Sequence, residues 1–562
     1  MNNRFSDACK TCLLTILLLG FAPAHAEQAP AHAVASAHPL ATQAGVEVLQ
    51  QGGNAFDAAI AVSAALGVVE PFSSGFGGGG FWLLHRASDG KQVMLDGRET
   101  APSLAHERMY RDEQDNVIKD ASMQGPLAAG IPGLPAALVH LAEHYGRLPL
   151  RRSLAPAIRY AEEGFKVTSR YHRLAVYMTA TLNRYPDAAG IFLQDGKPPR
   201  IGYQIRQQDL ARTIEAIAEH GRDGFYRGPV AQQLVQEARR HGGVWRAQDL
   251  ESYQVVERAP IIFQYRDMRV VSAPLPSSGG IVIAQTLRML EQFNLDEMSN
   301  VQRKHYIVEA MRRAFRDRAL FLGDPDFVPA PVQRLLDPAY LEGLALTIDA
   351  QRATPSEILG EGPALTQTGT QTTHFSVLDR EGNRVAGTLS INTLFGACFV
   401  AAGTGVLFNN EMDDFSIKRL TPNAYGLIGD EANAIAPGKR PLSSMTPTFL
   451  ETPDRVGIVG TPGGSRIISM VMLAALDFAA GKLPDSWVSL RRFHHQYQPD
   501  QVQFELHGLS EFEQQRLTAL GHELKEITRR YGNMQAILWD RTQDRVYSAS
   551  DPRGEGLAVV VE

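Results

Sequence analysis

The stretch Gln371-Thr-Thr-His-Phe-Ser-Val-Leu-Asp-Arg-Glu-Gly-Asn-Arg-Val-Ala-Gly-Thr-Leu-Ser-Ile-Asn392 decides the fold. Polar and apolar residues alternate in its first and last thirds, and a short acidic, glycine-containing segment lies between them. That pattern predicts a β-hairpin. Apolar side chains such as Phe375 and Leu389 occupy odd positions and face a core, whereas Thr372 and His374 share the polar face.

The register of this hairpin determines which polar groups lie beside Thr372. Antiparallel partners have a constant sum of residue numbers, so a turn centred on Glu381 pairs Thr372 with Ser390, and one centred on Gly382 pairs it with Asn392. Both registers place Thr372 next to a hydroxyl or an amide. The polar stripe is either a site held rigidly by a sheet or a solvated strand face, and the hairpin alone leaves both open.

The first 26 residues have the pattern of a secretory signal. Arg4 and Lys10 precede a mostly apolar run over residues 12–21, and Ala24-His-Ala26 follows. The run is shorter than the ~20 residues needed to span a bilayer. The sequence therefore predicts cleavage near Ala26 and a soluble, exported protein in the periplasm or outside the cell.

Composition excludes several classes of function. The 562 residues carry 55 basic and 61 acidic side chains, a net charge of -6, which gives no reason to expect a nucleic-acid partner. No segment after the signal is long and apolar enough to cross a bilayer, so no stable membrane insertion is expected. The glycine run over residues 73–80 matches G-x-G-x-x-G, but a helix is expected before it and a strand after it, the reverse of a dinucleotide site. His494 and His495 lack a third ligand. We therefore expect neither a cofactor nor a metal.

The rest of the chain is mixed in secondary structure. Residues 356–371 are rich in Thr, Gln, Gly and Pro and predict an exposed, mobile segment that ends at the decisive hairpin. A second hairpin is expected from residues 81–86 and 92–96. Helical patterns cover residues 54–69, 154–163, 210–220, 230–240 and 302–322.

The start of this stretch and three further blocks resemble those of a known family. The chain contains Gln371-Thr-Thr-His-Phe-Ser-Val377, Asn409-Asn-Glu-Met-Asp-Asp-Phe415, Arg440-Pro-Leu-Ser-Ser-Met445 and Thr461-Pro-Gly-Gly-Ser-Arg466. These resemble the signature blocks of the gamma-glutamyltranspeptidases, members of the N-terminal nucleophile hydrolase superfamily. The resemblance implies an α+β fold, a four-layer αββα sandwich formed by two chains cut from one precursor. The precursor would consist of a signal (1–26), a large subunit (27–371) and a small catalytic subunit (372–562).

The resemblance also implies a role for each site residue. Cleavage between Gln371 and Thr372 frees Thr372 as the nucleophile, whose own α-amino group is the base, and the Ser390 hydroxyl supports it. Arg98, Ser443 and Ser444 bind the substrate α-carboxylate; Asn392, Glu411 and Asp414 bind its α-ammonium; Gly463 and Gly464 bind the oxyanion; and Tyr425 belongs to a lid over residues 419–436.

Two positions depart from parts of the family. Ser390 stands where a threonine is common, so the methyl that fixes the rotamer is lost, and slower maturation or turnover is expected. Glu411 stands where some bacterial members carry glutamine, and its charge favours an ammonium group.

The implied activity is that of a gamma-glutamyltransferase and glutathione hydrolase. Its partners are glutathione and other γ-glutamyl compounds as donors, water, amino acids or peptides as acceptors, and the two subunits for each other. One alternative is a cephalosporin-type acylase that removes a glutaryl group, which has no ammonium to meet Glu411 and Asp414. A second is a catalytically weak secreted binding protein on the same scaffold.

Overall fold

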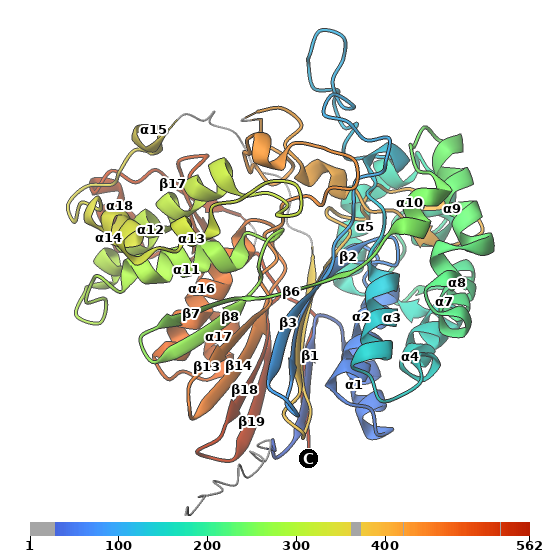
Figure 1. Cartoon of the computed structure of the whole chain (residues 1–562), viewed down its shortest axis with the longest axis horizontal. Coiled ribbons are helices and arrows are strands. Elements are labelled where there is room, and N and C mark those ends of the chain that lie inside the picture. Colours follow the sequence, from blue (N-terminus) through green and yellow to red (C-terminus); the bar gives the residue numbers. More distant parts are fainter. Residues whose placement is uncertain (1–27, 361–371, 420, 529) are drawn as a thin grey trace, which may run out of the picture.

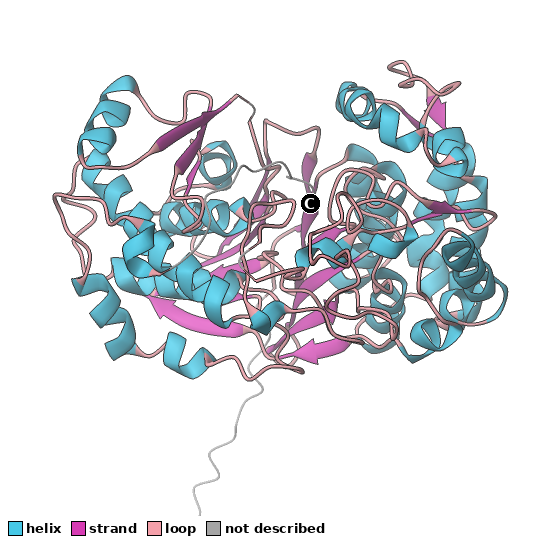
Figure 2. Ribbon diagram, turned by 90° about the horizontal axis from the view of Figure 1, so that it is seen from above, coloured by secondary structure: helices cyan, strands magenta, loops and turns pink. Residues whose placement is uncertain are grey.

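Two antiparallel β-sheets pack face to face, and helices cover both outer sides (Figure 1). The computed structural model describes residues 28–360, 372–419, 421–528 and 530–562. Seen from above, the strands occupy the middle and the helices lie on either side (Figure 2). In spatial order, the first sheet contains β20 (Leu557–Val561), β1 (His32–Ser36), β9 (Thr373–Leu378), β10 (Arg384–Ser390), β2 (Gly79–Arg86), β3 (Lys91–Gly97) and β6 (Val256–Arg258). The second contains β19 (Arg545–Ser550), β18 (Gln535–Asp540), β14 (Arg455–Gly460), β13 (Thr448–Glu451), β8 (Met268–Ser272) and β7 (Ile261–Tyr265).

Three apolar layers hold the four layers of structure together. Phe81, Leu83 and Ile458 are among the residues packed between the two sheets. The outer face of the first sheet packs against α1 (Pro39–Gln50), α2 (Ala55–Val69) and α3 (Leu134–His144), and α4 (Leu150–Glu163), α7 (Gln208–His220) and α9 (Gly228–Arg240) extend the same apolar cluster outward. The outer face of the second packs against α11 (Gly279–Leu290), α16 (Arg466–Ala479) and α17 (Pro484–Ser489), and α12 (Asn300–Phe321) and α14 (Pro338–Leu346) pack on α11 from outside.

The decisive hairpin forms at the centre of the first sheet. β9 pairs with β10 so that Leu389 lies opposite Thr373 and Val385 opposite Val377. The sum of these numbers is 762 in both cases, which puts the centre of the turn at Glu381 and, continued by one residue, sets Thr372 opposite Ser390. The first of the two registers is therefore the one observed.

Both faces of the hairpin are buried, so the alternative of a solvated strand face is wrong. Phe375 packs towards the helices, as its parity predicts. On the other face, His374 Nδ1 lies 2.8 Å from Thr388 Oγ1, and the Ser376 hydroxyl donates to the Gln535 carbonyl oxygen of β18 at 3.2 Å. The second sheet covers this face, and its backbone supplies the hydrogen-bond partners that water would have provided.

The expected helices and the second hairpin are present. α2 begins after Asn54, whose side chain accepts hydrogen bonds from the amides of Phe56 and Asp57 and so caps the helix. β2 and β3 form the other hairpin. The start of residues 356–371 is only partly as expected: Ser356–Leu359 forms the short helix α15, in which Ser356 is buried but Glu357 and Ile358 are exposed. Residues 361–371, including Gln371, lie outside the described residues, as does the predicted signal.

The glycine run before β2 permits close backbone packing beneath the hairpin. A Cβ on Gly77 would lie 2.0 Å from the Leu407 carbonyl oxygen, and one on Gly78 would lie 2.2 Å from that of Ser390. A side chain at Gly77 would displace the backbone at Leu407, and one at Gly78 would displace the end of β10. Among the described residues, none of the helices is both long and apolar enough to cross a membrane.

Candidate active site

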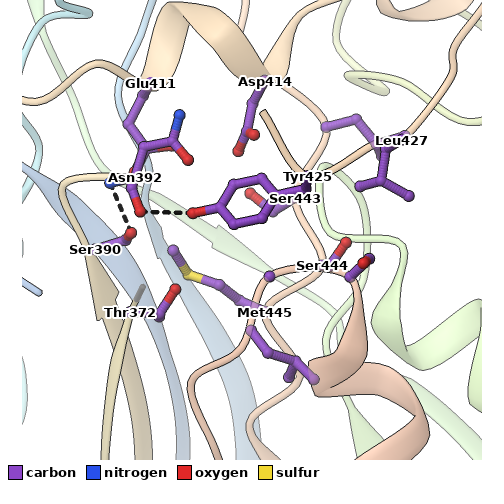
Figure 3. A pocket seen from close by; sticks show the side chains of 14 residues that line it. Thr372, Ser390, Asn392, Glu411, Asp414, Tyr425, Leu427, Ser443, Ser444 and Met445 are labelled. Atoms are coloured by element: carbon purple, nitrogen blue, oxygen red, sulfur yellow. Dashed lines mark hydrogen bonds between the residues drawn. The ribbon is translucent and has the colours of Figure 1, made fainter. Parts of the chain in front are cut away.

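Thr372, the residue directly before β9, lines a small cavity. The cavity has a volume of about 20 Å³, room for roughly one water molecule. Figure 3 shows side chains from several loops converging there. The lining residues are Thr372, Ser390, Asn392, Glu411, Asp414, Tyr425, Leu427, Leu442, Ser443, Ser444, Met445, Gly464, Ser465 and Ile467. Nine of the site residues expected from the sequence thus meet at one place, although they are spread along the chain from Thr372 to Gly464.

One wall of the cavity carries acidic side chains. Arg98 is fully buried behind that wall and does not line the cavity. Its Nη1 donates to Glu99 at 2.8 Å, and its Nη2 donates to Glu411 at 2.9 Å and to Asp414 at 3.2 Å. One guanidinium therefore meets three carboxyl groups, and two of these, Glu411 and Asp414, line the cavity, so this wall is acidic.

Burial and mutual repulsion perturb these groups. Desolvation and the nearby Glu411 charge raise the pKa values of Glu99 and Asp414 well above their usual range. Desolvation alone would lower the pKa of Arg98, but the Glu411 and Glu99 carboxylates reverse that effect and raise it. A cationic ligand group would relieve the same repulsion.

Three buried polar atoms at the cavity have no hydrogen-bond partner among the described residues. They are Asn392 Oδ1, Glu411 Oε1 and Ser443 Oγ. An unpaired buried polar atom costs about 1–3 kcal/mol, so native proteins rarely retain one without use. The first two atoms accept hydrogen bonds and the third can donate one, which matches a ligand with both an ammonium and a carboxylate.

Tyr425 lines the cavity and comes from the segment over residues 419–436 that the sequence predicts to be a lid. Its hydroxyl donates to the Asn392 carbonyl oxygen at 2.6 Å (Figure 3). The backbone N–H of Asn392 in turn donates to Ser390 Oγ at 2.8 Å. That bond fixes the Ser390 hydroxyl oxygen, so the rotamer control expected from a threonine methyl is supplied by the backbone here.

Gly463 and Gly464 precede α16 and could not carry side chains. Gly464 has φ +59°, and a Cβ on it would lie 2.3 Å from Cδ1 of Tyr425. Gly463 has φ +147°, and a Cβ there would lie 2.7 Å from Cε of Met470. Backbone amides at the start of a helix favour an anion. Of the two, Gly464 lines the cavity and Gly463 does not.

The sequence assigned no role to Glu99, although it adjoins Arg98 in the block Asp96-Gly-Arg-Glu99, and that adjacency was an available signal. The apolar lining residues Leu427, Leu442, Met445 and Ile467 were also missed. They carry no distinguishing pattern, because a residue beside a cavity looks like a core residue until the fold is known.

Comparison with known proteins identifies the family. The sequence model of the gamma-glutamyltranspeptidases matches residues 41–561. The chain belongs to this family. It is 41% identical over 578 residues to a glutathione hydrolase proenzyme of Pseudomonas sp. strain A14, with 99% of each chain covered. It is 40% identical over 542 residues to that of Escherichia coli K12, covering 95% of this chain and 92% of the relative.

A solved structure supports the same fold. The cephalosporin acylase of Bacillus halodurans superposes with a TM-score of 0.82 at 30% identity, covering 95% of this chain and 96% of the acylase. The predicted four-layer αββα sandwich of the N-terminal nucleophile hydrolases is thereby confirmed.

Proposed function

We propose that this gamma-glutamyltranspeptidase cuts itself before Thr372 and then cleaves the γ-glutamyl bond of glutathione and related compounds. The γ-glutamyl group passes to water or to an amino acid or peptide. The observation that carries the proposal is the cavity itself, in which Thr372 lies between an acidic wall and a pair of serine hydroxyls. The names of the Pseudomonas and E. coli relatives agree with it.

Maturation creates the catalytic group. Before the cut, the Thr372 nitrogen is an amide and cannot accept a proton. After the cut between residues 371 and 372 it is an α-amino group, with an ordinary pKa near ~7.7–8.0, and can take the proton of the same residue's hydroxyl. The products are a chain of residues 27–371 and a chain of residues 372–562, with the signal removed on export.

The reaction then follows from the geometry. The Thr372 oxygen attacks the γ-carbonyl carbon, and the Gly463 and Gly464 amides stabilise the oxyanion, each such donor lowering the barrier by about 2.7–4 kcal/mol. The α-amino group returns its proton to the leaving amine as the C–N bond breaks, which leaves a γ-glutamyl ester. Water or an acceptor amine, deprotonated by the same α-amino group, attacks the ester and restores Thr372.

The charges of the cavity orient the donor. Glu411, Asp414 and the Asn392 side-chain oxygen receive the α-ammonium group. The hydroxyls of Ser443 and Ser444 bind the α-carboxylate. Arg98 supplies positive charge from behind the first wall, and its direct contact with the carboxylate requires that it leave one of its carboxylate partners. Tyr425 covers the bound donor.

A glutaryl acylase is the second candidate, because the acylase structure matches nearly the whole chain. A glutaryl group carries the carboxylate but no ammonium. It would leave the buried charge of Glu411 and Asp414 uncompensated, so the glutamyl donor is favoured.

A gel and two substrates test the proposal. Purified protein should show two bands, with Thr372 at the N-terminus of the smaller, and Thr372→Ala should remain a single precursor. Mature protein should hydrolyse γ-glutamyl-p-nitroanilide faster than glutaryl-p-nitroanilide. Full activity from an uncut chain would refute the mechanism, and preference for the glutaryl compound would favour the acylase.

A further inference from the structure

A second buried arginine stands behind the serine pair. Arg318 lies on α12 and is 4% exposed. Its Nε donates to Ser278 Oγ at 2.9 Å, and its Nη2 donates to Ser444 Oγ at 3.3 Å. Arg318 lies in none of the family blocks, and the sequence does not distinguish it from the four other arginines of α12.

The two buried arginines of the site differ in their partners. Arg98 is matched by three carboxylates, whereas Arg318 forms no ion pair within the described part of the chain. Burial lowers the pKa of Arg318 to about 10, with the Asp414 charge acting in the opposite direction, so the guanidinium is positive at neutral pH. A buried charge without a counter-ion is costly, and an anion in the adjacent cavity would supply one.

The contacts of Arg318 determine how the serines can bind that anion. The Ser444 oxygen accepts a hydrogen bond from Arg318, so its own proton is left to donate elsewhere. The Ser443 hydroxyl has no partner among the described residues and lines the same cavity. Two hydroxyl donors backed by a positive charge suit a carboxylate.

Arg318 also fixes the backbone that carries the serines. The Ser278 hydroxyl, which accepts from Arg318, donates to the Ser443 carbonyl oxygen at 2.8 Å, and the Ser278 amide donates to the same oxygen at 2.9 Å. The Ser443 amide donates to the Pro276 carbonyl oxygen at 2.8 Å. A chain of contacts thus runs from α12 through Ser278 to the serine pair.

We propose that Arg318 is the positioning residue for the substrate α-carboxylate: it orients the Ser444 hydroxyl directly, holds Ser443 through Ser278, and supplies the compensating positive charge. The inference rests on the proposed function, since it concerns the donor of that same site. It assigns the two arginines different duties. Arg98 balances Glu411 and Asp414 and reaches the carboxylate only by leaving one of them, whereas Arg318 supports the serine hydroxyls that receive the carboxylate.

Three p-nitroanilides that differ by one charged group test this assignment. The γ-glutamyl compound carries both groups, the 4-aminobutyryl compound lacks the carboxylate, and the glutaryl compound lacks the ammonium. In Arg318→Gln, kcat/KM should fall about 10- to 100-fold for the glutamyl and glutaryl compounds, the range of a hydrogen bond to a charged group. It should change little for the 4-aminobutyryl compound, so the glutamyl to aminobutyryl ratio falls by the same factor.

Arg313→Gln is the matched control. Arg313 lies on the same helix and is equally buried, but it contacts Glu309 and Thr347. The Arg313→Gln variant should leave the ratio of kcat/KM between the glutamyl and 4-aminobutyryl compounds unchanged. Arg318→Lys keeps the charge but loses the two-pronged geometry, so it should retain part of the glutamyl to aminobutyryl preference.

Each outcome is decisive. Equal losses for all three compounds in Arg318→Gln, or an unchanged preference for the carboxylate, would overturn the role of Arg318. If that variant does not mature on a gel, the same ratio in Arg318→Lys and Ser278→Ala decides, with a fall required in both. A mature wild type that hydrolyses no γ-glutamyl compound would instead refute the proposed function.

Discussion

The hydroxyl of Tyr425 is expected to set how often the proposed lid, residues 419–436, opens. The cavity has a volume of about 20 Å³ and cannot admit a γ-glutamyl group while the Tyr425 ring lies over Gly464. Opening must therefore precede entry of the donor. Tyr425→Phe keeps the ring and removes the hydrogen bond to the Asn392 carbonyl oxygen, which is 2.6 Å long and buried.

The size of the effect follows from that one bond. A neutral hydrogen bond contributes about 0.5–1.5 kcal/mol net, so its loss raises the open population about 2- to 12-fold. Hydrogen–deuterium exchange measures this population directly. The Tyr425 and Leu427 amides both donate to Asn423 Oδ1 within the segment, and their exchange rates should rise by that factor.

Tyr547→Phe is the control, because the Tyr547 hydroxyl donates to Gln543 on an exposed edge far along the chain. It should leave exchange in the lid segment unchanged. Wild-type exchange rates for the Tyr425 and Leu427 amides in Tyr425→Phe would refute the reasoning, since the hydrogen bond would then contribute nothing to closure.

Four further results are expected. Arg98→Met strands three carboxylates and should lower the free energy of unfolding in urea by about 3–5 kcal/mol, whereas Glu99→Gln removes one of the repelling charges and should be neutral or stabilising. Burial lowers the pKa of His374 to about 3. Between pH 6.5 and 3, His374 therefore binds a proton in the unfolded chain but not in the folded one, and this lowers the free energy of unfolding of the wild type by up to about 4–5 kcal/mol. His374→Gln lacks this proton-binding group, so its free energy of unfolding should fall by that much less over the same pH range. Gly464→Ala should displace Tyr425 and lower kcat/KM about 100-fold or more, measured on mature protein.

The alternation of residues 371–392 was enough to predict the central hairpin and the burial of Phe375, because side-chain parity is a local property of a strand. The polar face was harder. Whether His374 meets water or a second sheet depends on strands more than 80 residues away, such as β14 and β18, and no local pattern contains that information. The choice between the two registers depended on the turn, which the fold places at Glu381.

The site divides in a similar way. Family blocks located Thr372 and the serine pair, and the structure brings them to one cavity. The blocks did not disclose that Arg98 is already matched by carboxylates, nor that Arg318 stands behind the serines. Both features depend on tertiary contacts between elements far apart in the sequence. The partner of a buried charge is set by packing between elements, so the sequence gives the charge but not its counter-ion.

The position of the proposed cut explains how one residue could serve as both nucleophile and base. β9 is held on one edge by β1 and on the other by β10. Both sheets join strands from the two sides of the cut, since β10 pairs with β2 and β13 pairs with β8. Cleavage before Thr372 therefore removes no strand from either sheet. The new amino group remains at the end of a strand that β10 holds as far as Thr373 and β1 holds as far as Phe375, and it lies beside Ser390. A terminus on a free edge would fray, and its amine would have no constant distance from the substrate.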